Sequence, residues 1–595
     1  MARDRKPPPS GSDPAWDRVM WLFQNESPEF VDEIRLHVNA AALSSFAETW
    51  YSDSRIEARR FLLAYLERPL NAARHEPLIK RLFKFADNAG DDAVMGRFLV
   101  ALDRIIRRRR GTARRWNQKT RSMEKVEIIT LSPGSTLSRE DRFVSGPWFA
   151  QNREIYTAGK FLFSIPTRHY LRRRAWRYFR KLGKKQPDRY IPAVLSALKL
   201  YTDADVPDGL GLLDNWGMVH ILFHHSPTLK AKRTGWRVAE DATLPQLQPD
   251  PMFRKLWLKS PEPIFDLLVN GKCRTVLLWS ARMLQRNFPD RLVRVTRDEL
   301  LDWLVADNDV LNGLAMDLLE RCGGLEKVPI NRWLKLTEAA RPELLDRICE
   351  MVLRVVKPEQ VSFSDAVRLA MQRSFPLARM GRIFLTGKKP SNPAEIQVVF
   401  GLREAEAEPL RAELVRWAWS VLAEQPDFHP LWVLEFLDSR HNDVREVGWE
   451  WLQSDVRARE DVTVWQRLLE SPHDNIRLRL VGMLEDRAKE REGLAKFSQE
   501  LVRFLWATVL LNVYRGSRAK PLVVRQVMDR LSAKPDEAGE LLPIVAVAMR
   551  SIRGPEFRAG LAGVVEFVEK NPTRKELVEA VFPELQFGEQ ASGIL

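Results

Sequence analysis

The sequence of 595 residues predicts an all-α protein in which helical hairpins stack into a solenoid. Apolar residues recur three and four positions apart along almost the whole chain, which is the period of an amphipathic helix. Pro, Gly and Asp interrupt this pattern at intervals of about 15–20 residues, as expected at the ends of short helices. The third observation is internal repetition, because one segment near the C-terminus recurs with an offset of 32 residues. Together these features indicate helical pairs that bury their apolar faces against one another.

The repetition is clearest where residues 439–452 align without gaps with residues 471–484. The two copies share a Ser, a His, a β-branched residue followed by Arg, and a Leu. We expect a polar turn with Asp or Asn to cap the second helix of each hairpin. Small residues, namely Gly448, Gly482 and, in a looser copy, Ala418, are expected where neighbouring helices approach closely.

Asp443, Val444 and Arg445, followed by Gly448 and Leu452, resemble the second helix of HEAT repeats, a family of α-helical hairpin repeats. Other segments of the chain match this motif more loosely. The resemblance implies a HEAT-like, right-handed solenoid with irregular inserts. The family's period of about 40–47 residues implies about ten to twelve helical pairs.

Changes in composition divide the predicted array into parts. These are a disordered, Pro-rich tail (1–14), N-terminal helical repeats (15–111), an irregular insert (112–165), central helical repeats (166–400) with a loop at 226–262, C-terminal HEAT-like repeats (401–584) and a loose tail (585–595). The insert contains a short apolar alternation at 126–131, which indicates a small β-hairpin. Long excursions from a compact array are often functional.

Two short segments carry all of the chain's excess positive charge. The first basic segment, residues 104–125, contains ten Lys or Arg residues and one acid. The second basic segment, residues 168–189, has the same balance, so the two sum to +18 while the whole chain is +15. Charge concentrated in this way favours an extended anionic partner, and nucleic acid is the commonest one.

Plotted as a helix, the second basic segment separates into two faces. The apolar face consists of Leu171, Ala175, Tyr178, Phe179 and Leu182, with Trp176 close by. The opposite face, predicted to bind nucleic acid, consists of Arg173, Arg174, Arg177, Arg180, Lys181 and Lys184. Arg172 intrudes on the apolar face and is expected to pair with a carboxylate. Like charges on one face repel, so an anionic partner would relieve the repulsion; pairing with acidic neighbours and plain solvation are the alternatives.

In the first basic segment, the arginine run is expected to close a helix, where cations interact favourably with the negative end of the helix dipole. The predicted nucleic-acid-binding residues of this segment are Arg107, Arg108, Arg109, Arg110, Arg114 and Arg115. Trp116 and Trp148 lie in the insert and are candidates for stacking against bases, with burial in a core as the alternative.

Residues 164–237 resemble the helical region of bacterial proteins related to the molybdate metabolism regulator. The resemblance rests on 170–183, which reads Tyr-Leu-Arg-Arg-Arg-Ala-Trp-Arg-Tyr-Phe-Arg-Lys-Leu-Gly, and on 200–205 and 215–223. Many proteins of this group also carry a WGR domain, a small module linked to DNA ends and nicks. No recognisable WGR module occurs in this chain, so the resemblance favours DNA only by association.

Signatures of catalysis are missing from the sequence. No glycine-rich phosphate loop, nucleophile elbow or dinucleotide motif occurs, so neither a cofactor nor a catalytic residue is predicted. The three cysteines lie far apart, which indicates a reducing compartment rather than a disulfide framework. His220 and His224 have a spacing that zinc can use, but histidines satisfied within the fold are favoured, so no metal site is predicted. The apolar runs are too short to span a bilayer.

These observations predict a non-enzymatic scaffold of the bacterial cytoplasm that holds nucleic acid, with DNA favoured, through phosphate contacts. Residues 401–584 are expected to bind a protein partner or to complete the array. Two alternatives stay open. One is a protein-interaction scaffold whose basic segments meet acidic partners. The other is an enzyme of the helical-repeat DNA glycosylase type, which uses aromatic residues and a carboxylate in a concave channel.

Overall fold

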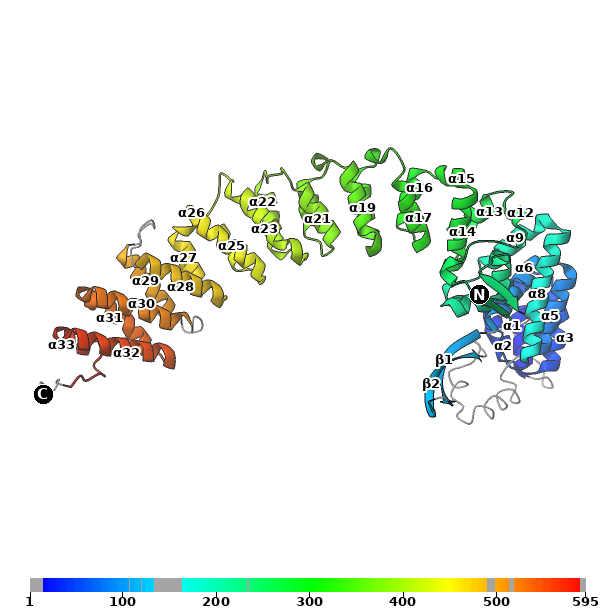
Figure 1. Cartoon of the computed structure of the whole chain (residues 1–595), viewed down its shortest axis with the longest axis horizontal. Helices are drawn as coiled ribbons and strands as arrows, with labels where there is room; N and C mark the ends of the chain where they lie inside the picture. The colour runs from blue at the N-terminus through cyan, green and yellow to red at the C-terminus, as the bar shows by residue number, and fades with distance from the viewer. Residues whose placement is uncertain are drawn as a thin grey trace, which may run out of the picture. The chain divides into compact units, whose positions relative to one another are not determined.

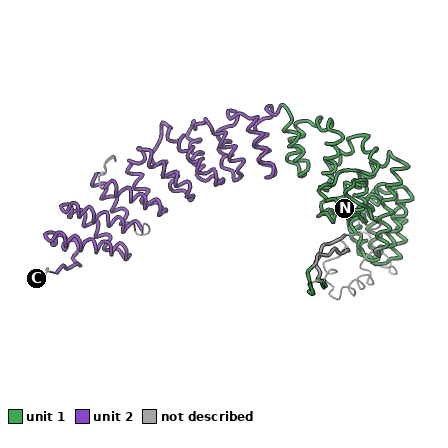
Figure 2. Tube along the Cα trace, viewed as in Figure 1, with its two compact units in different colours: residues 1–323 green, residues 324–595 purple. Residues whose placement is uncertain are grey.

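A computed structural model describes residues 14–105, 107–118, 120–132, 163–232, 235–488, 498–512 and 518–588. Over these residues the protein is all-α with two small β-hairpins, which confirms the predicted fold class. The chain divides into two compact units, Met1–Gly323 and Gly324–Leu595 (Figure 2). Among the described helices, none combines the length and the apolar character that crossing a bilayer requires.

Unit 1 consists mainly of helices, with two β-hairpins between them (Figure 1). Its helices are α1 (Pro14–Gln24), α2 (Phe30–Leu36), α3 (Ala40–Ser52), α4 (Ile56–Glu67), α5 (Glu76–Ala89), α6 (Asp92–Ile105), α8 (Ile165–Lys185), α9 (Pro187–Leu198), α10 (Gly209–Asp214), α11 (Trp216–Phe223), α12 (Arg254–Trp257), α13 (Glu262–Asn270), α14 (Arg274–Asn287), α15 (Pro289–Val293), α16 (Arg297–Leu304) and α17 (Asp309–Leu319). Local chemistry sets several boundaries. The Asn39 side chain accepts hydrogen bonds from the backbone of Ala41 and Ala42 where α3 begins, and Gly90 ends α5 in the left-handed conformation, with φ of 67°.

The arginine run does not close a helix, which corrects the expectation drawn from the sequence. Helix α6 ends at Ile105, and Arg107–Asn117 forms strand β1, which pairs antiparallel with β2 (Ser122–Ser132). The apolar alternation predicted to form a hairpin lies in β2, and its register places Arg110 opposite Ile129. The β-branched residues of β2 favour a strand, and cross-strand pairing draws the arginines into it.

The region 226–262, expected to be an irregular loop, contains a second small hairpin and a short helix. Strands β3 (Leu229–Lys232) and β4 (Gly235–Val238) pair antiparallel, and α12 follows. Trp236 on β4 and Trp257 on α12 are both buried. These two rings anchor the region to the helices around it, because burying an aromatic side chain removes a large apolar area from water.

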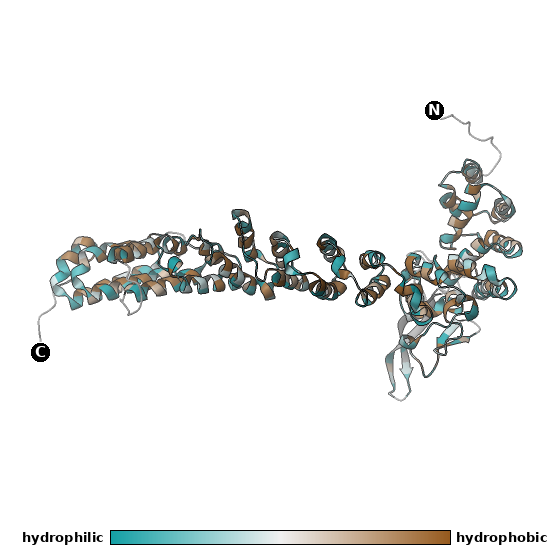
Figure 3. Ribbon diagram, turned by 90° about the horizontal axis from the view of Figure 1, so that it is seen from above, coloured by the Kyte–Doolittle hydropathy of each residue, from teal (hydrophilic) through white to brown (hydrophobic). Residues whose placement is uncertain are grey.

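Unit 2 is entirely helical in the part that the structure describes. Its helices are α18 (Ile330–Ala339), α19 (Pro342–Val355), α20 (Phe363–Ala370), α21 (Phe375–Phe384), α22 (Pro393–Phe400), α23 (Glu408–Ala423), α24 (Trp432–Leu437), α25 (Asn442–Ser454), α26 (Val456–Arg459), α27 (Val462–Leu469), α28 (Asp474–Ala488), α29 (Gln499–Leu511), α30 (Ala519–Ala533), α31 (Ala538–Met549), α32 (Gly554–Lys570) and α33 (Lys575–Val581). Brown and teal segments alternate along these helices in Figure 3, as in amphipathic helices with one buried face.

Contacts in unit 2 join helices that are close in sequence. Helix α21 packs on α19, α20 and α23; α25 packs on α23 and α24; and α30 packs on α28, α29, α31 and α32 (Figure 1). Trp333, Trp451, Trp465 and Trp506 are fully buried between these helices. The apolar faces of these helices are therefore buried largely against helices that are near them in the sequence.

The repeated sequence positions make equivalent bonds. The Arg445 guanidinium donates to the carbonyl oxygen of Ser439 (2.7 Å), and Arg477, 32 residues later, donates to that of Ser471. The hydroxyl of each of these serines also accepts from the backbone N–H two residues on, at 3.2 and 3.3 Å. The shared Ser, His and Arg positions therefore define one turn that leads into α25 and, again, into α28.

Two details of the predicted hairpin are wrong. Asp443 does not cap α25, because its carboxylate accepts from the buried Arg411 of α23 at 3.2 Å. A Cβ atom on Gly448 would lie 3.2 Å from the Leu437 backbone, so α24 and α25 do approach closely there, whereas a Cβ on Gly482 would meet nothing within 4 Å. Gly482 lies two positions beyond the equivalent of Gly448 and is exposed on α28.

Candidate nucleic-acid interface

Helix α8 carries the second basic segment up to Lys185, as predicted, and Asp188 and Arg189 lie at the start of α9. Ser164 caps its N-terminus by accepting from the Thr167 backbone N–H (3.4 Å), and the helix then runs for 21 residues. The predicted apolar face is buried, with Ala175 and Phe179 fully enclosed, and the helix packs on α6, α9 and α11. Burial of that face fixes the helix rotation and turns the opposite face to solvent.

Five cations of α8 face solvent and are not neutralised by the residues that the structure describes. They are Arg177, Arg180, Lys181, Lys184 and Lys185, and we refer to them as the α8 cation face. All five are exposed, and none forms an ion pair within the part of the chain that the structure describes. The segment's single acid, Asp188, pairs instead with Lys259 (3.4 Å). Residues three and four apart lie on one side of a helix, so the five charges repel each other.

Other arginines of the two basic segments are held by acids of neighbouring helices. Arg174 donates to Asp87 of α5 at 2.8 and 2.9 Å, and its guanidinium also lies over the Phe83 ring. Arg189 pairs with Asp92 (2.9 Å), and Arg104 pairs with the buried Asp205 (2.8 Å). Arg174, predicted to contact nucleic acid, is therefore already neutralised by a structural ion pair.

Arg172 is buried, as its place on the apolar face requires. Its Nη1 donates to the Asp214 carbonyl oxygen (3.1 Å), and its guanidinium lies over the Trp216 ring. Burial raises the pKa of the Asp103 carboxyl to about 6, and the positive charge of Arg172 opposes that rise. The expected partnership of Arg172 with a carboxylate thus takes the form of an electrostatic interaction with Asp103.

Tyr170 is a member of the exposed face that the sequence analysis missed. Its side chain is 46% exposed, and the Arg177 guanidinium lies 5.9 Å from the ring centroid. Tyr170 precedes Arg174, Arg177 and Lys181 by four, seven and eleven positions, so the same helical plot places it among the cations. The solvent-facing surface of α8 therefore combines positive charge with an aromatic ring.

Apart from Arg104 at the end of α6, the first basic segment lies on the β1–β2 hairpin. Arg114, Trp116, Met123 and Lys125 are exposed there, whereas the structure describes only the backbone of Arg107–Arg110 and Arg115. Trp148 lies outside the described residues. Strand β1 contacts α10, α10 contacts α11, and α11 contacts α8. The two basic segments thus belong to one unit and are linked through α10 and α11.

The histidines considered for zinc lie inside unit 1. His220 Nδ1 and His224 Nδ1 are 2.8 Å apart, and the His220 ring stacks on Trp176 with centroids 4.8 Å apart. Burial lowers the pKa of His220 to about 2 and that of His224 to about 4, so both are neutral and share one hydrogen bond. The described residues contain no cluster of three or more His, Cys, Asp or Glu side chains able to hold a metal.

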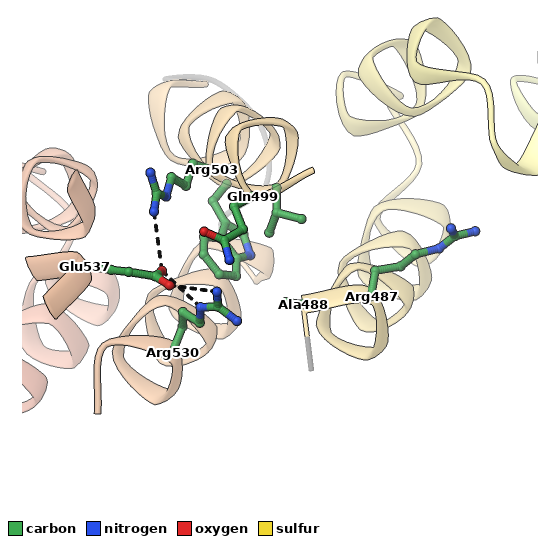
Figure 4. Close-up of a pocket in the computed structure, with 8 residues that line it drawn as sticks. Arg487, Ala488, Gln499, Arg503, Arg530 and Glu537 are labelled. Carbon is green, nitrogen blue, oxygen red and sulfur yellow. Dashed lines mark hydrogen bonds and ion pairs between the residues drawn. The ribbon is translucent and has the colours of Figure 1, made fainter. Parts of the chain in front are cut away.

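A small pocket in unit 2 bears on the glycosylase alternative (Figure 4). Trp506 and Glu537 both line it, which are the residue types that such an enzyme uses. The Glu537 carboxylate accepts from Arg530 (2.8 and 3.0 Å) and from Arg503 (3.4 Å), and these bonds lower its pKa. A carboxylate held by two guanidinium groups is poorly placed to act as a base, so the pocket does not favour the enzyme.

Comparison with known proteins adds no identification. The chain matches no protein-family model, and no curated protein matches it in sequence.

Proposed function

We propose that the protein is a HEAT-like helical-repeat scaffold that binds nucleic acid through phosphate contacts at the α8 cation face. The exposed cations of the β1–β2 hairpin, Arg114, Arg121 and Lys125, extend the same positive character in unit 1. DNA is the favoured nucleic acid because of the family resemblance of residues 164–237. The binding would be sequence-independent, since phosphate contacts position a nucleic acid without reading its bases.

The observation that supports the proposal most strongly is that the cations of the α8 cation face have no acidic partner among the described residues. Elsewhere several exposed arginines pair with an acid of a neighbouring helix, for example Arg416 with Glu450 and Arg479 with Glu446. Within unit 1, Arg174 and Arg189 are paired in the same way. Five adjacent cations that lack such partners among the described residues repel each other, and a polyanion would relieve that repulsion and release counterions as it binds.

The number of unneutralised cations fixes the expected salt dependence. If each cation of the α8 face meets one phosphate of a duplex, the slope of log K against log salt concentration is about −4.5. Raising the salt from 50 to 200 mM would then weaken binding by about 500-fold. Additional contacts from the hairpin would make the slope steeper.

The test is fluorescence anisotropy with labelled DNA from 50 to 200 mM salt. Changing Arg177, Arg180, Lys181 and Lys184 to Glu should reduce the steepness of the slope by about 3.6 and weaken binding throughout. A control variant changes four exposed cations of unit 2, namely Lys335, Arg354, Arg373 and Arg379, to Glu. It alters the net charge equally and should retain most of the affinity. If the α8 variant and the control lose the same affinity, or neither loses any, the proposal is wrong.

An acidic protein partner is the second candidate, because the same five cations would attract aspartate and glutamate side chains. The anisotropy experiment separates the two with a polyglutamate competitor. If polyglutamate displaces DNA at equal concentration of negative charge, acidic proteins become the better assignment. Nucleic acid is favoured if DNA remains bound at that concentration.

A further inference from the structure

Near its tip, the β1–β2 hairpin presents an exposed apolar pair next to a pair of cations. The register places Trp116 opposite Met123 and Arg114 opposite Lys125. Alternate residues of a strand share one face, so these four side chains lie together on one side of the hairpin, which we call the hairpin face. The Trp116 side chain is 59% exposed and that of Met123 is 55% exposed. A large apolar pair left in water at the end of a ribbon is therefore available to a partner.

The acid nearest to this pair is directed away from the hairpin face. Glu124 lies on the other face, where it accepts hydrogen bonds from Thr120 (2.6 Å) and Asn117 (2.8 Å). These bonds lower the pKa of Glu124 and keep it anionic and engaged. Arg121, in the turn between the strands, adds another exposed cation and adopts the left-handed conformation with φ of 48°. The hairpin face thus has an aromatic centre with positive flanks.

Tyr170 gives α8 the same combination. Its half-exposed ring lies among the cations of α8, with the Arg177 guanidinium above it. Aromatic rings set among phosphate-binding cations are the means by which proteins hold unpaired nucleotides, since the rings stack on bases while the cations follow the backbone.

We infer that the preferred ligand is a single-stranded nucleic acid whose bases stack on Trp116 and Tyr170. This inference rests on the proposed nucleic-acid function and deepens it. In a duplex, neighbouring base pairs cover the faces of each base, and inserting a side chain requires unstacking them. Unpaired bases expose those faces without that cost, and phosphates on either side of a stacked base can contact the flanking cations.

The decisive experiment compares three labelled ligands of about 30 nucleotides: oligothymidylate, an abasic strand of the same length, and a duplex. The abasic strand keeps the phosphates and removes the bases. Trp116→Ala and Tyr170→Ala should each weaken oligothymidylate binding by about 5- to 150-fold and leave the abasic strand unaffected. Neither substitution removes a charge, so the salt slope should stay the same. Trp116→Phe, which keeps a stacking ring, should recover most of the loss.

Trp21→Ala is the matched control, because Trp21 is 50% exposed and lies on α1, away from both basic segments in the sequence. It should not affect any of the three ligands. The inference is overturned if the two ring variants bind oligothymidylate as tightly as wild type does. It is also overturned if their affinity for the abasic strand falls as much as their affinity for oligothymidylate. It is also overturned if wild type prefers the duplex to oligothymidylate. A fourth ligand, oligouridylate, shows whether the protein prefers RNA or DNA. A preference for either single strand over the duplex supports the inference.

The outcomes separate this inference from the proposed function. If the α8 charge variant loses binding while the ring variants do not, nucleic-acid binding stands and base stacking fails. If the α8 charge variant binds every ligand as wild type does, the proposed function fails as well.

Discussion

Acid should destabilise unit 1 because it contains buried histidines whose hydrogen bonds require the neutral ring. His75 is fully buried, with Nδ1 2.7 Å from the Tyr65 hydroxyl and Nε2 3.0 Å from the His37 carbonyl oxygen. The carbonyl can only accept, so Nε2 carries the proton and Nδ1 accepts from Tyr65. Burial lowers the pKa of His75 to about 4. In the His220–His224 pair, one Nδ1 must likewise accept a hydrogen bond from the other. If both rings were protonated, both Nδ1 atoms would carry a proton and this hydrogen bond would be lost.

The size of the effect follows from the difference in proton binding between the folded and unfolded chains. A histidine in the unfolded chain takes up a proton below about pH 6.5, whereas buried His75 stays neutral down to about pH 4. The unfolded state therefore binds more protons in this window, and the free energy of unfolding decreases as the pH falls. At pH 5 the loss from His75 is about 2 kcal/mol, and the His220–His224 pair adds a loss of the same sign.

Asp103 opposes this trend. Its pKa is raised to about 6, so the folded state takes up a proton before the unfolded state does, and stability increases by about 1.4 kcal/mol between pH 7 and pH 5. The histidine losses exceed this gain. With about 2 kcal/mol from His75 and about as much from the coupled His220–His224 pair, the net loss at pH 5 is about 2 to 3 kcal/mol, which is a large fraction of the usual stability of a domain.

Urea unfolding of the full chain at pH 7, 6 and 5, followed by limited proteolysis, measures this effect in each unit. Peptides from unit 1 should appear at lower urea as the pH falls. His220→Phe keeps an aromatic ring against Trp176 and removes one titrating group, so its urea midpoint should depend less on pH than that of wild type. If the unit 1 midpoint is the same at pH 5 and pH 7, or if His220→Phe has the full pH dependence, the assignment of buried neutral histidines is wrong.

Two further predictions test the packing and the division of the α8 arginines. Gly381→Ala should destabilise unit 2 by about 3 kcal/mol, because the new Cβ would lie 2.2 Å from the Ala370 backbone nitrogen and force α20 and α21 apart. Gly482→Ala meets nothing within 4 Å and should stabilise α28 by up to about 1 kcal/mol; thermal unfolding of both variants checks the contrast. Arg174→Ala should cost about 1 kcal/mol of stability in urea unfolding but change DNA affinity less than Arg177→Ala does, since Arg174 is held by Asp87. Equal losses of DNA affinity in the two variants would contradict the assignment of Arg174 to a structural ion pair and of Arg177 to the binding surface.

Features that depend on a local period were predictable from the sequence. Helix α8 and the burial of its apolar face follow from residues within one short window, because a helix repeats every 3.6 residues. The turn shared by 439–452 and 471–484 was also predictable, since the same Ser and Arg positions recur and form the same bonds. Tyr170 could have been found in the same way from its place on the helical plot.

Features that depend on distant partners were not predictable. Strand β1 forms because the arginine run pairs with residues about twenty positions later, and helix periodicity within the run contains no information about that pairing. The Arg174–Asp87 ion pair joins residues 87 positions apart, so a helical plot counts Arg174 as free. The surroundings of Gly482 could not be predicted for the same reason. Whether a glycine contacts a neighbouring helix depends on which side of its own helix packs against that neighbour.

The charge of a segment in the sequence therefore overstates the charge that a partner meets. The second basic segment has ten cations, but Arg168 and Arg172 are buried, and Arg174 and Arg189 are paired with acids. Arg173 is partly buried. The other five form the α8 cation face and are concentrated on the last three turns of one helix. The local density of these charges matters more for binding than the total charge of the segment. Neighbouring cations three and four positions apart repel each other, and an anion that contacts several of them at once relieves that repulsion. A flexible chain of phosphates can do this, and the exposed ring of Tyr170 beside those cations gives such a chain's bases a surface on which to stack.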